Sequence, residues 1–365
     1  MKKTVSTLMA VLLMLSFLFG CRNPNAPVED DVISGEVTIY TSHSASEQQL
    51  FTRKFHELYP EVTINWVSAS LAQSIERLER EKNDPQCDVL MGGLMQSDGE
   101  VYRHLFQPYV PYRIEEQSVI DEEHYYQYYI TQVMAFLVNT AKLEELGLTV
   151  DDIHKYTDLL KPELKGQILF GDPSASSGGF RSLTTILAVF GDGEVSALSP
   201  GWFYMRNLME NLDGVYAAKA SDVTQFVDSG DYAVGLSFES SCIQRLVNKM
   251  PDIAVVYPEE GNTQVRFASA MVRNCKNPDI AGKVIDYLLS REYAEERTRL
   301  LGASRSTNMT AQISDMIPEV SVLKLVDLKF DRINENREKI LAKYAELWDY
   351  LGGARTIVGN ENTSD

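Results

Sequence analysis

The sequence predicts an α/β protein, because short apolar strands alternate with amphipathic helices from residue 37 onward. Residues 37–41, 62–67 and 88–91 are short runs rich in β-branched and apolar side chains, as strands are. The helices between them would have apolar faces made of Phe51, Phe55, Leu58 and Tyr59, and of Leu71, Ile75 and Leu78. This order is typical of a mainly parallel sheet with helices on both faces, in which ligands bind beyond the carboxyl ends of the strands.

The composition is that of a globular protein with room for two domains. The chain has 365 residues, of which 44% are hydrophobic and 24% are charged. Its formal net charge of −18, without a cluster of Lys and Arg, argues against a nucleic-acid partner. A small anionic ligand stays compatible with this charge, because distant surface carboxylates are screened within about 10 Å.

The first twenty residues have the pattern of a signal peptide. Two lysines precede an apolar run at 8–19, which is shorter than the roughly 20 residues of a membrane-spanning helix. The sequence Leu18-Phe19-Gly20-Cys21 resembles the lipobox of bacterial lipoproteins, in which the chain is cut before a lipidated cysteine. The resemblance implies a signal peptide at 1–20, a lipid anchor on Cys21 and a flexible tether at 21–35. A plain secretory signal with a chance cysteine is the alternative.

The three remaining cysteines are Cys87, Cys242 and Cys275. An odd number cannot all pair, and none of them has the Cys or His spacing of a zinc site. We therefore expect at least one buried thiol and no metal site built on cysteine, while one disulfide stays possible.

The stretch at 170–187 is predicted to run from a short strand through a serine- and glycine-rich loop into a helix. A helix N-terminus has unpaired N–H groups and a partial positive charge, so it can hold a phosphate or carboxylate. The residues of this predicted anion cradle are Ser174, Ser176, Ser177, Gly178 and Gly179. The simpler alternative is that Ser176 or Ser177 only caps the helix.

The rest of the chain continues the alternation of strands and helices. An aromatic run at 125–129 leads into the apolar residues 135–139, which favours a buried crossing strand over a stacking platform for a ring, with His124 at the surface. Strands are predicted at 232–238, 253–257 and 267–272, and helices around Val223 to Val227, Ile243 to Met250, 279–302 and 333–351, before a disordered tail.

Polar and small residues gather where these elements begin or end. They are Ser42, His43 and Ser44 after the first strand, Gly92 and Gly93 after the third, Ser221 and Asp222 at a helix start, and Glu239 after the strand at 232–238. Such positions are where binding residues concentrate. The alternative for Asp222 and Glu239 is that each carboxylate only favours a helix N-terminus.

Several segments, in this order and spacing, are similar to the extracellular solute-binding proteins of bacterial ABC importers, in the group that contains ferric-ion, phosphonate and hexose-phosphate binders. They are VTIYTSHSASE, FLVNTAKLEELGL, DLLKPELKGQILFGDPSASSGG, DYAVGLSFES, YPEEGN and KNPDIAGKVIDYLLSREYAEE. The resemblance implies the two-lobed type II periplasmic binding protein fold, with two crossover strands and a ligand cleft between the lobes. It implies lobe one at 36–134 and 266–325, lobe two at 135–265, and a C-terminal helix and tail at 326–365.

A few positions of the resemblance bear on the ligand. The ferric branch has two adjacent tyrosines where this chain has Phe238-Glu239-Ser240, and it often has a carboxylate where this chain has Gly92-Gly93, so His43 alone remains as an iron ligand. The serine loop followed by Ser-Phe-Glu looks more like the phospho-ligand binders. By that likeness Ser42, Ser44, Ser176, Ser177 and Gly178 would hold phosphate, and Asp222 and Glu239 the organic group.

These expectations combine into one functional hypothesis. The protein is expected to be a monomeric, exported binding protein, lipid-anchored to a bacterial membrane, that passes a phosphorylated small molecule such as a hexose phosphate to an ABC permease, without a cofactor or metal. Ferric-ion or phosphonate binding, or presentation of the ligand to a sensor kinase, are the alternatives. A hydrolytic enzyme using Ser, His43 and a carboxylate is the rival class, but no G-x-S-x-G motif occurs.

Overall fold

The computed structural model describes residues 33–191, 199–301, 305–312, 314–352 and 356–359. The predicted signal peptide, the predicted lipidation at Cys21 and most of the predicted tether lie outside these residues, as does most of the predicted disordered tail. Among the helices that the structure describes, none combines the length and the apolar composition that a membrane crossing requires.

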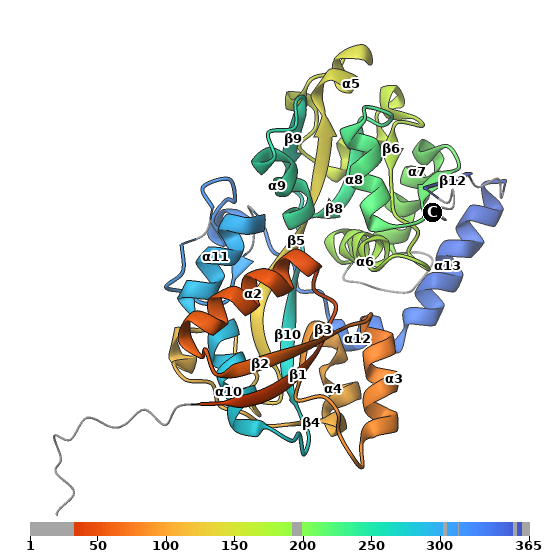
Figure 1. Ribbon diagram of the computed structural model, residues 1–365. Helices are drawn as coiled ribbons and strands as arrows, with labels where there is room; N and C mark the ends of the chain where they lie inside the picture. Colours follow the sequence, from red (N-terminus) through yellow and green to blue (C-terminus); the bar gives the residue numbers. More distant parts are fainter. Residues whose placement is uncertain (1–32, 192–198, 302–304, 313, 353–355, 360–365) are drawn as a thin grey trace, which may run out of the picture. The chain divides into compact units, whose positions relative to one another are not determined.

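One large mixed sheet organises the chain (Figure 1). Its neighbouring strands are, in order, β2 (Val62–Ser68), β1 (Gly35–Thr41), β3 (Val89–Met95), β10 (Gln264–Val272), β5 (Gln127–Asn139), β8 (Val234–Phe238) and β6 (Ile168–Leu169). Three shorter strands pair beside this path: β4 (Phe106–Gln107), β9 (Ile253–Val256) and β11 (Arg305–Ser306). A separate parallel pair joins β7 (Val215–Ala217) to β12 (Thr356–Val358).

The pairing divides the sheet into two parallel parts joined by antiparallel crossover strands. β1 pairs parallel with β2 and β3, and β6 pairs parallel with β8. We call the part built on β1, β2 and β3 lobe one and the part built on β6 and β8 lobe two. β5 and β10 run antiparallel to their neighbours and connect both parts, so the fold is the two-lobed α/β architecture that the sequence predicted.

β5 is the longer crossover strand, and all of its residues are buried. Its first half pairs with β10 and β11, and its second half pairs with β8 and β9. The aromatic run at 125–129 therefore leads into and partly forms a buried crossing strand, as predicted. His124 is half-buried and has a φ of 60° at the turn before the strand, so it is not a fully exposed surface residue.

The longer helices are α2 (Ala45–Leu58), α3 (Leu71–Glu81), α6 (Ser177–Gly191), α7 (Pro200–Leu212), α8 (Ala220–Asp228), α9 (Glu239–Val247), α10 (Pro278–Leu288), α11 (Arg291–Leu301) and α13 (Arg337–Tyr350). The shorter helices are α4 (Gly99–Tyr102), α5 (Thr140–Glu145) and α12 (Phe330–Glu335). Single 3-10 turns lie at Gln96–Asp98 (η1), Arg103–Leu105, Ile114–Glu116, Val150–Asp152, Tyr156–Leu160, Pro162–Leu164 and Val320–Val322.

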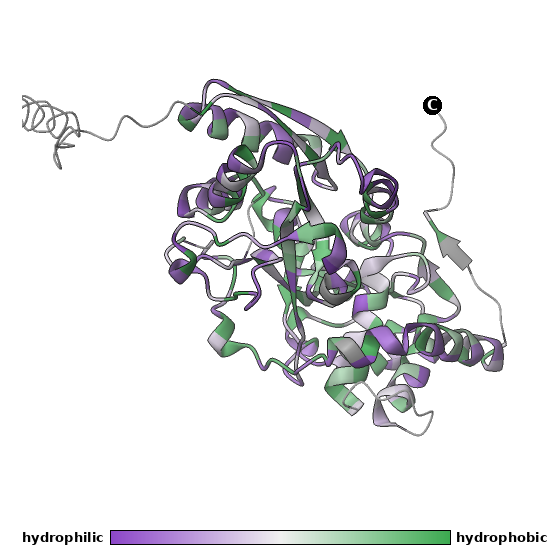
Figure 2. Ribbon diagram, turned by 90° about the horizontal axis from the view of Figure 1, so that it is seen from below, coloured by the Kyte–Doolittle hydropathy of each residue, from purple (hydrophilic) through white to green (hydrophobic). Residues whose placement is uncertain are grey.

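Hydrophobic residues concentrate on the central strands and on the inner faces of the helices around them (Figure 2). In lobe two, α6, α7 and α13 share one core with the second half of β5, and this core includes the fully buried Trp202 and the aromatic residues Tyr344 and Trp348 of α13. Burying one large apolar side chain contributes roughly 1.5–3 kcal/mol, so α13 is an integral part of lobe two.

Three details of the predicted helices differ in the structure. The predicted helix at 333–351 is two helices that meet at Asn336, whose side-chain amide donates to the carbonyl of Arg332 and so competes with the helical pattern. Leu58 was assigned to the apolar face of α2, but it is the last residue of that helix and is 59% exposed. α9 ends at Val247, so Met250 lies beyond it and is 37% exposed.

Candidate functional site

The predicted residues of lobe one lie together where β1 ends. The sequence analysis placed Gly92 and Gly93 in a loop after β3, and this prediction was wrong. Both glycines lie inside the strand and form a bulge, where its pairing with β10 is shifted. Both have positive φ, 80° and 84°, which favours glycine. A Cβ atom on Gly92 would lie 2.6 Å from Cδ2 of His43, and one on Gly93 would lie 3.1 Å from Oγ of Ser42. The bulge thus gives room to the residues after β1.

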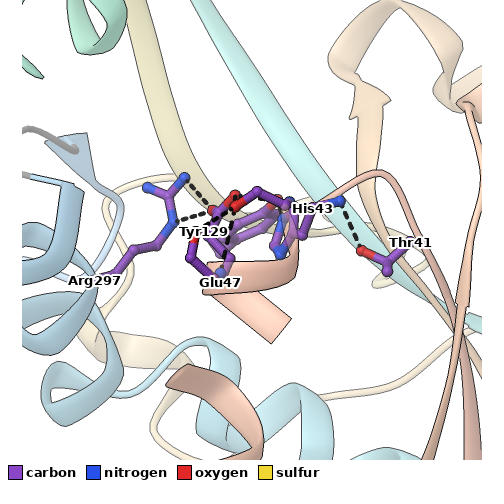
Figure 3. Close-up of polar contacts among 7 residues, drawn as sticks. Thr41, His43, Glu47, Tyr129 and Arg297 are labelled. Atoms are coloured by element: carbon purple, nitrogen blue, oxygen red, sulfur yellow. Dashed lines mark hydrogen bonds and ion pairs between the residues drawn. The ribbon is translucent and has the colours of Figure 1, made fainter. Parts of the chain in front are cut away.

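His43 is held by the protein on two sides (Figure 3). Its backbone N–H donates to Oγ1 of Thr41 at 3.0 Å, and its ring Nε2 lies 2.7 Å from the hydroxyl of Tyr129 on β5. Loss of solvent around the ring lowers the pKa of His43 to about 4, with a smaller opposing effect from Glu47. The imidazole is therefore neutral at pH 7. The sequence analysis did not anticipate the contact with Tyr129.

Ser44 begins α2 and is used within its own helix. It forms a capping box with Glu47, in which Oγ of Ser44 accepts from the N–H of Glu47 and the carboxylate of Glu47 accepts from the N–H of Ser44. Glu47 also pairs with Arg297 of α11, at 3.0 Å (Figure 3). The N-terminus of α2 thus already holds a carboxylate, which leaves less positive field there for a ligand.

The N-terminus of α6 is the stretch that the sequence predicts as an anion cradle. Ser176 is buried and caps the helix, because its Oγ accepts from the N–H of Gly179 at 3.2 Å. The hydroxyl of Ser174 donates to Asp172 at 2.7 Å. Ser177 is exposed, and the amides of Ser177 and Gly178 donate to no described residue. Ser176 therefore caps the helix, which is the simpler alternative, and the amides of Ser177 and Gly178 in the same turn remain as donors for an anion.

The start of α6 is packed closely against its neighbours in lobe two. A Cβ atom on Gly179 would collide with the carbonyl of Gly171, and one on Gly178 would lie 3.0 Å from Cβ of Ala220 in α8 and 3.9 Å from the ring of Phe238 at the end of β8. The first turns of α6 and α8 and the end of β8 therefore meet at one place.

An aromatic contact connects this place to lobe one. The ring of Phe238 lies edge-on to that of Phe267 on β10, with centroids 6.2 Å apart, and Phe267 is paired with Met95 at the end of β3. Met95 follows the glycine bulge by two residues. The sequence-predicted residues on β3 and α6 therefore face the same junction between the lobes.

Asp222 is the third residue of α8 and is buried. Its Oδ2 accepts from the N–H of Lys219 at 3.0 Å, and Ser221 is exposed beside it, with its hydroxyl 3.4 Å from Oδ1. The chain at Gly359, directly after β12, lies against the same carboxylate. Asp222 thus acts as a carboxylate at a helix N-terminus, which is the alternative that the sequence analysis left open.

Glu239 is the first residue of α9, and its side chain is 2% exposed. Both carboxylate oxygens accept from Arg305 of β11, whose Nε and Nη2 lie 2.7 and 2.8 Å away. The remaining nitrogen, Nη1, is buried without a hydrogen-bond partner among the described residues. Arg305 was not predicted as a site residue, because nothing near it in the sequence marks it as one.

Metal and cysteine chemistry find little support in the described part of the chain. No three or more His, Cys, Asp or Glu side chains in that part are grouped as a metal site would require. Cys87, Cys242 and Cys275 are all free and buried, and burial raises the pKa of each thiol, so these cysteines are unreactive. The expectation of at least one buried thiol is confirmed, and the possible disulfide is absent.

Comparison with curated proteins finds relatives of this chain, among them the following two. A Haemophilus influenzae protein of uncharacterised function is 24% identical over 324 residues, which cover 86% of this chain and 90% of the relative. A Salmonella typhimurium periplasmic protein named for 2-aminoethylphosphonate binding is 20% identical over 238 residues, which cover 63% of this chain and 66% of the relative.

Solved structures share the fold at low sequence identity. AfuA from Actinobacillus pleuropneumoniae, solved with fructose-6-phosphate bound, has a TM-score of 0.71 and 23% identity, with 86% of this chain and 98% of AfuA covered. A ferric binding protein from Campylobacter jejuni has a TM-score of 0.69 and 19% identity, with 85% of this chain and 99% of that chain covered. Residues 100–330 also match the family model described as bacterial extracellular solute-binding protein. This chain belongs to the family of bacterial extracellular solute-binding proteins, which its sequence resembles.

Proposed function

We propose that this solute-binding protein captures a phosphorylated small organic molecule, such as a hexose phosphate, for an ABC importer. The observation that carries the proposal is the first turn of α6, where the amides of Ser177 and Gly178 donate to no described residue, with Ser177 exposed and Gly178 packed beside Ala220 and Phe238. The helix dipole adds to these donors, because a phosphate at a helix N-terminus meets both partial charge and N–H groups.

The magnitudes are sufficient for useful affinity. A hydrogen bond to a charged group contributes roughly 1.5–3 kcal/mol and a helix terminus roughly 0.3–2 kcal/mol, before desolvation and closure costs. Micromolar binding requires about −8 kcal/mol, which a few such contacts reach. In this proposal the hydroxyl of Ser42, exposed beside Gly93, is a further donor from lobe one, with Ser44, Gly92 and His43 beside it.

The organic part of the ligand would contact the carboxylates of lobe two. Asp222 and Glu239 already accept hydrogen bonds from Lys219 and Arg305, but a carboxylate has about four acceptor positions and can receive a ligand hydroxyl as well. Because carboxylates repel phosphate, these residues would orient a sugar phosphate and disfavour bare phosphate.

The relatives support this ligand class without deciding it. AfuA was solved with fructose-6-phosphate, and the Salmonella protein is named for a phosphonate, which offers the same kind of tetrahedral oxyanion. A phosphonate is therefore the second candidate, since the open amides of α6 would hold it equally well. Ferric ion is disfavoured, because β8 ends at Phe238 and is followed directly by Glu239 and Ser240, which supply no phenolate.

Binding without catalysis is part of the proposal. A hydrolytic serine needs a base within hydrogen-bond reach, whereas Nε2 of His43 lies against Tyr129.

We also propose that the exported protein is held at the membrane by a lipid on Cys21, and that the lobes follow the limits predicted from the sequence. Transfer of the ligand signal to a sensor kinase would use the same binding event.

The test is calorimetry with fructose 6-phosphate, glucose 6-phosphate, 2-aminoethylphosphonate, free fructose and inorganic phosphate. We expect one phosphate ester to bind far better than free fructose or inorganic phosphate. Ser177→Asp should abolish this binding by placing a carboxylate in the first turn of α6, while Ser321→Asp adds the same charge at an exposed position as a control. Equal binding of fructose and its phosphate, or unchanged binding by Ser177→Asp, would refute the proposal.

A further inference from the structure

Arg181 of α6 is a buried cation without an anionic partner. The residue is 5% exposed, and no carboxylate of the described residues forms an ion pair with it. Its Nη2 reaches the thioether of Met95 at 3.7 Å, and its guanidinium carbon lies 5.1 Å from the ring centroid of Phe330 in α12. Its Nη1 is buried without a hydrogen-bond partner among the described residues. Buried charges in proteins are normally paired, because desolvation of an unpaired charge is costly.

The position of this guanidinium is defined by its contacts. Arg181 lies one helical turn after Ser177, and helical side chains lean toward the N-terminus of their helix. Met95, which it contacts, ends β3 just after the glycine bulge and is paired with Phe267, the residue that packs on Phe238 beside Gly178. The guanidinium therefore lies near the first turn of α6 and the end of β3, over the ring of Phe330 in α12.

The surrounding charges leave an excess of positive charge. Asp98 of η1 is the neighbouring carboxylate, and its Oδ2 accepts from the N–H of Met95. Burial raises the pKa of Asp98, against smaller opposing effects of Met95, Arg181 and Arg337, and no ion pair within 4.0 Å joins it to Arg181 among the described residues. Arg337 of α13 lies over the ring of Phe180 at 4.0 Å and adds a second guanidinium. Two arginines and one aspartate give a net charge of one positive unit, and desolvation lowers the pKa of Arg181 to about 10.

We propose that Arg181 is a specificity-determining residue of the ligand site, whose guanidinium takes the anionic group of the ligand beside the first turn of α6. The proposal rests on the proposed function and adds a formal charge to the open amides of Ser177 and Gly178. A guanidinium offers two parallel N–H groups to a phosphate, so it would select a charged, tetrahedral group over a neutral hydroxyl.

The first arm of the test measures binding of fructose 6-phosphate to the full chain by calorimetry. We expect Arg181→Met to lose about 10- to 100-fold in affinity, from the loss of hydrogen bonds to a charged group. Arg181→Lys, which keeps the charge and loses the fork, should lie between Arg181→Met and wild type. Arg206→Met removes an exposed arginine of α7 and should bind as wild type does. Equal affinity of Arg181→Met and wild type would overturn the proposal.

The second arm separates a ligand contact from a structural role by thermal unfolding without ligand. Arg181→Met removes a buried charge that forms no ion pair with a described residue, so we expect Tm to rise by a few degrees. Arg297→Met, which removes the partner of buried Glu47, should lower Tm and serves as the contrast. A fall in Tm of Arg181→Met together with unchanged affinity would identify Arg181 as purely structural.

The third arm remains informative if the proposed ligand class fails. If the wild-type protein binds no fructose 6-phosphate, Tm is measured for wild type and for Arg181→Met, first in chloride and then in sulfate at the same ionic strength. The quantity compared is the rise in Tm that sulfate causes in each protein. A larger rise for wild type supports the anion contact at Arg181 although the phosphate ester is rejected. An equal response of the two proteins overturns the anion contact. Binding of fructose 6-phosphate by both proteins alike leaves the proposed function intact and removes Arg181 from it.

Discussion

Arg305 donates from Nε and Nη2 to the two carboxylate oxygens of Glu239, and both side chains are almost completely buried. Arg305 belongs to β11, which pairs with the first half of β5, and Glu239 begins α9 directly after β8. The ion pair therefore joins the two parts of the fold beside the crossover strand. Breaking such a pair leaves an uncompensated buried charge, whereas replacing both members with apolar residues costs much less.

The first prediction is that Glu239→Leu and Arg305→Met each lower the free energy of unfolding by about 3–5 kcal/mol. The double variant Glu239→Leu/Arg305→Met should recover much of this loss, since no charge is left unpaired. Urea denaturation at pH 7 measures all three values. If the double variant is as unstable as the sum of the single ones, the two residues do not act as a pair.

The second prediction concerns the pH dependence of stability. Burial, with a smaller effect of Arg297, lowers the pKa of His43 from 6.5 in the unfolded chain to about 4, against an opposing effect of Glu47. The unfolded state therefore binds the proton first, so this residue contributes stability that is present above pH 6.5 and is lost as the pH falls toward 4. The loss is up to roughly 3 kcal/mol.

This contribution is measured as a difference between two proteins. The unfolding free energy of wild type, minus that of His43→Gln, should fall between pH 6.5 and pH 4 and be constant above pH 7. A constant difference over the whole range would show that His43 titrates normally in the folded protein.

Local sequence patterns predicted most of the fold. Apolar periodicity is a property of each short segment, so it predicted the strands and helices of lobe one, the crossover strand β5 and helix α6. The glycine bulge in β3 was missed, because Gly92-Gly93 interrupts the strand pattern although β10 continues to pair across it. The break at Asn336 was missed because the apolar stripe runs on through it.

The site was predicted less completely, for a physical reason. The partners of its residues are distant in the sequence: 66 positions separate Glu239 from Arg305, and 86 separate His43 from Tyr129. Such contacts arise only when β5 and its neighbours assemble. The capping box of Ser44 and Glu47 was available locally as a Ser-x-x-Glu pattern and could have been read.

The third prediction is that Cys21→Ser releases the protein from the membrane fraction, because the lipid on this cysteine is proposed as its anchor. Cell fractionation with detection of the full chain measures the distribution. A Cys21→Ser protein that stays as firmly bound as wild type would place the anchor elsewhere.

The fourth prediction is that ferric citrate produces no visible phenolate band when it is added to the protein. The residues directly after β8, Glu239 and Ser240, are not tyrosines. Nε2 of His43 is already in contact with Tyr129, whose pKa is raised by burial. A protonated phenol is a poor ligand for a hard cation. An absorbance titration decides the point, and a saturable coloured complex would revive the ferric alternative.

The fifth prediction tests the glycine bulge that makes room for His43. Gly92→Ala would have a positive φ and a Cβ atom 2.6 Å from the imidazole, so we expect a loss of about 2–4 kcal/mol from backbone strain and overpacking together. Gly147→Ala is the matched control, because Gly147 has a φ of 76° but no atom within 4 Å of its would-be Cβ. It should lose only about 1–2 kcal/mol.

The same pair of variants reports on the ligand. Displacement of His43 by Gly92→Ala should weaken fructose 6-phosphate binding in calorimetry, because Ser42 and His43 share one turn after β1. Gly147→Ala should bind as wild type does, since Gly147 lies after α5 and away from the junction of the lobes. Equal destabilisation of the two variants would mean that the turn after β1 moves freely away from β3, and the close approach of the bulge to His43 would then have no part in shaping the site.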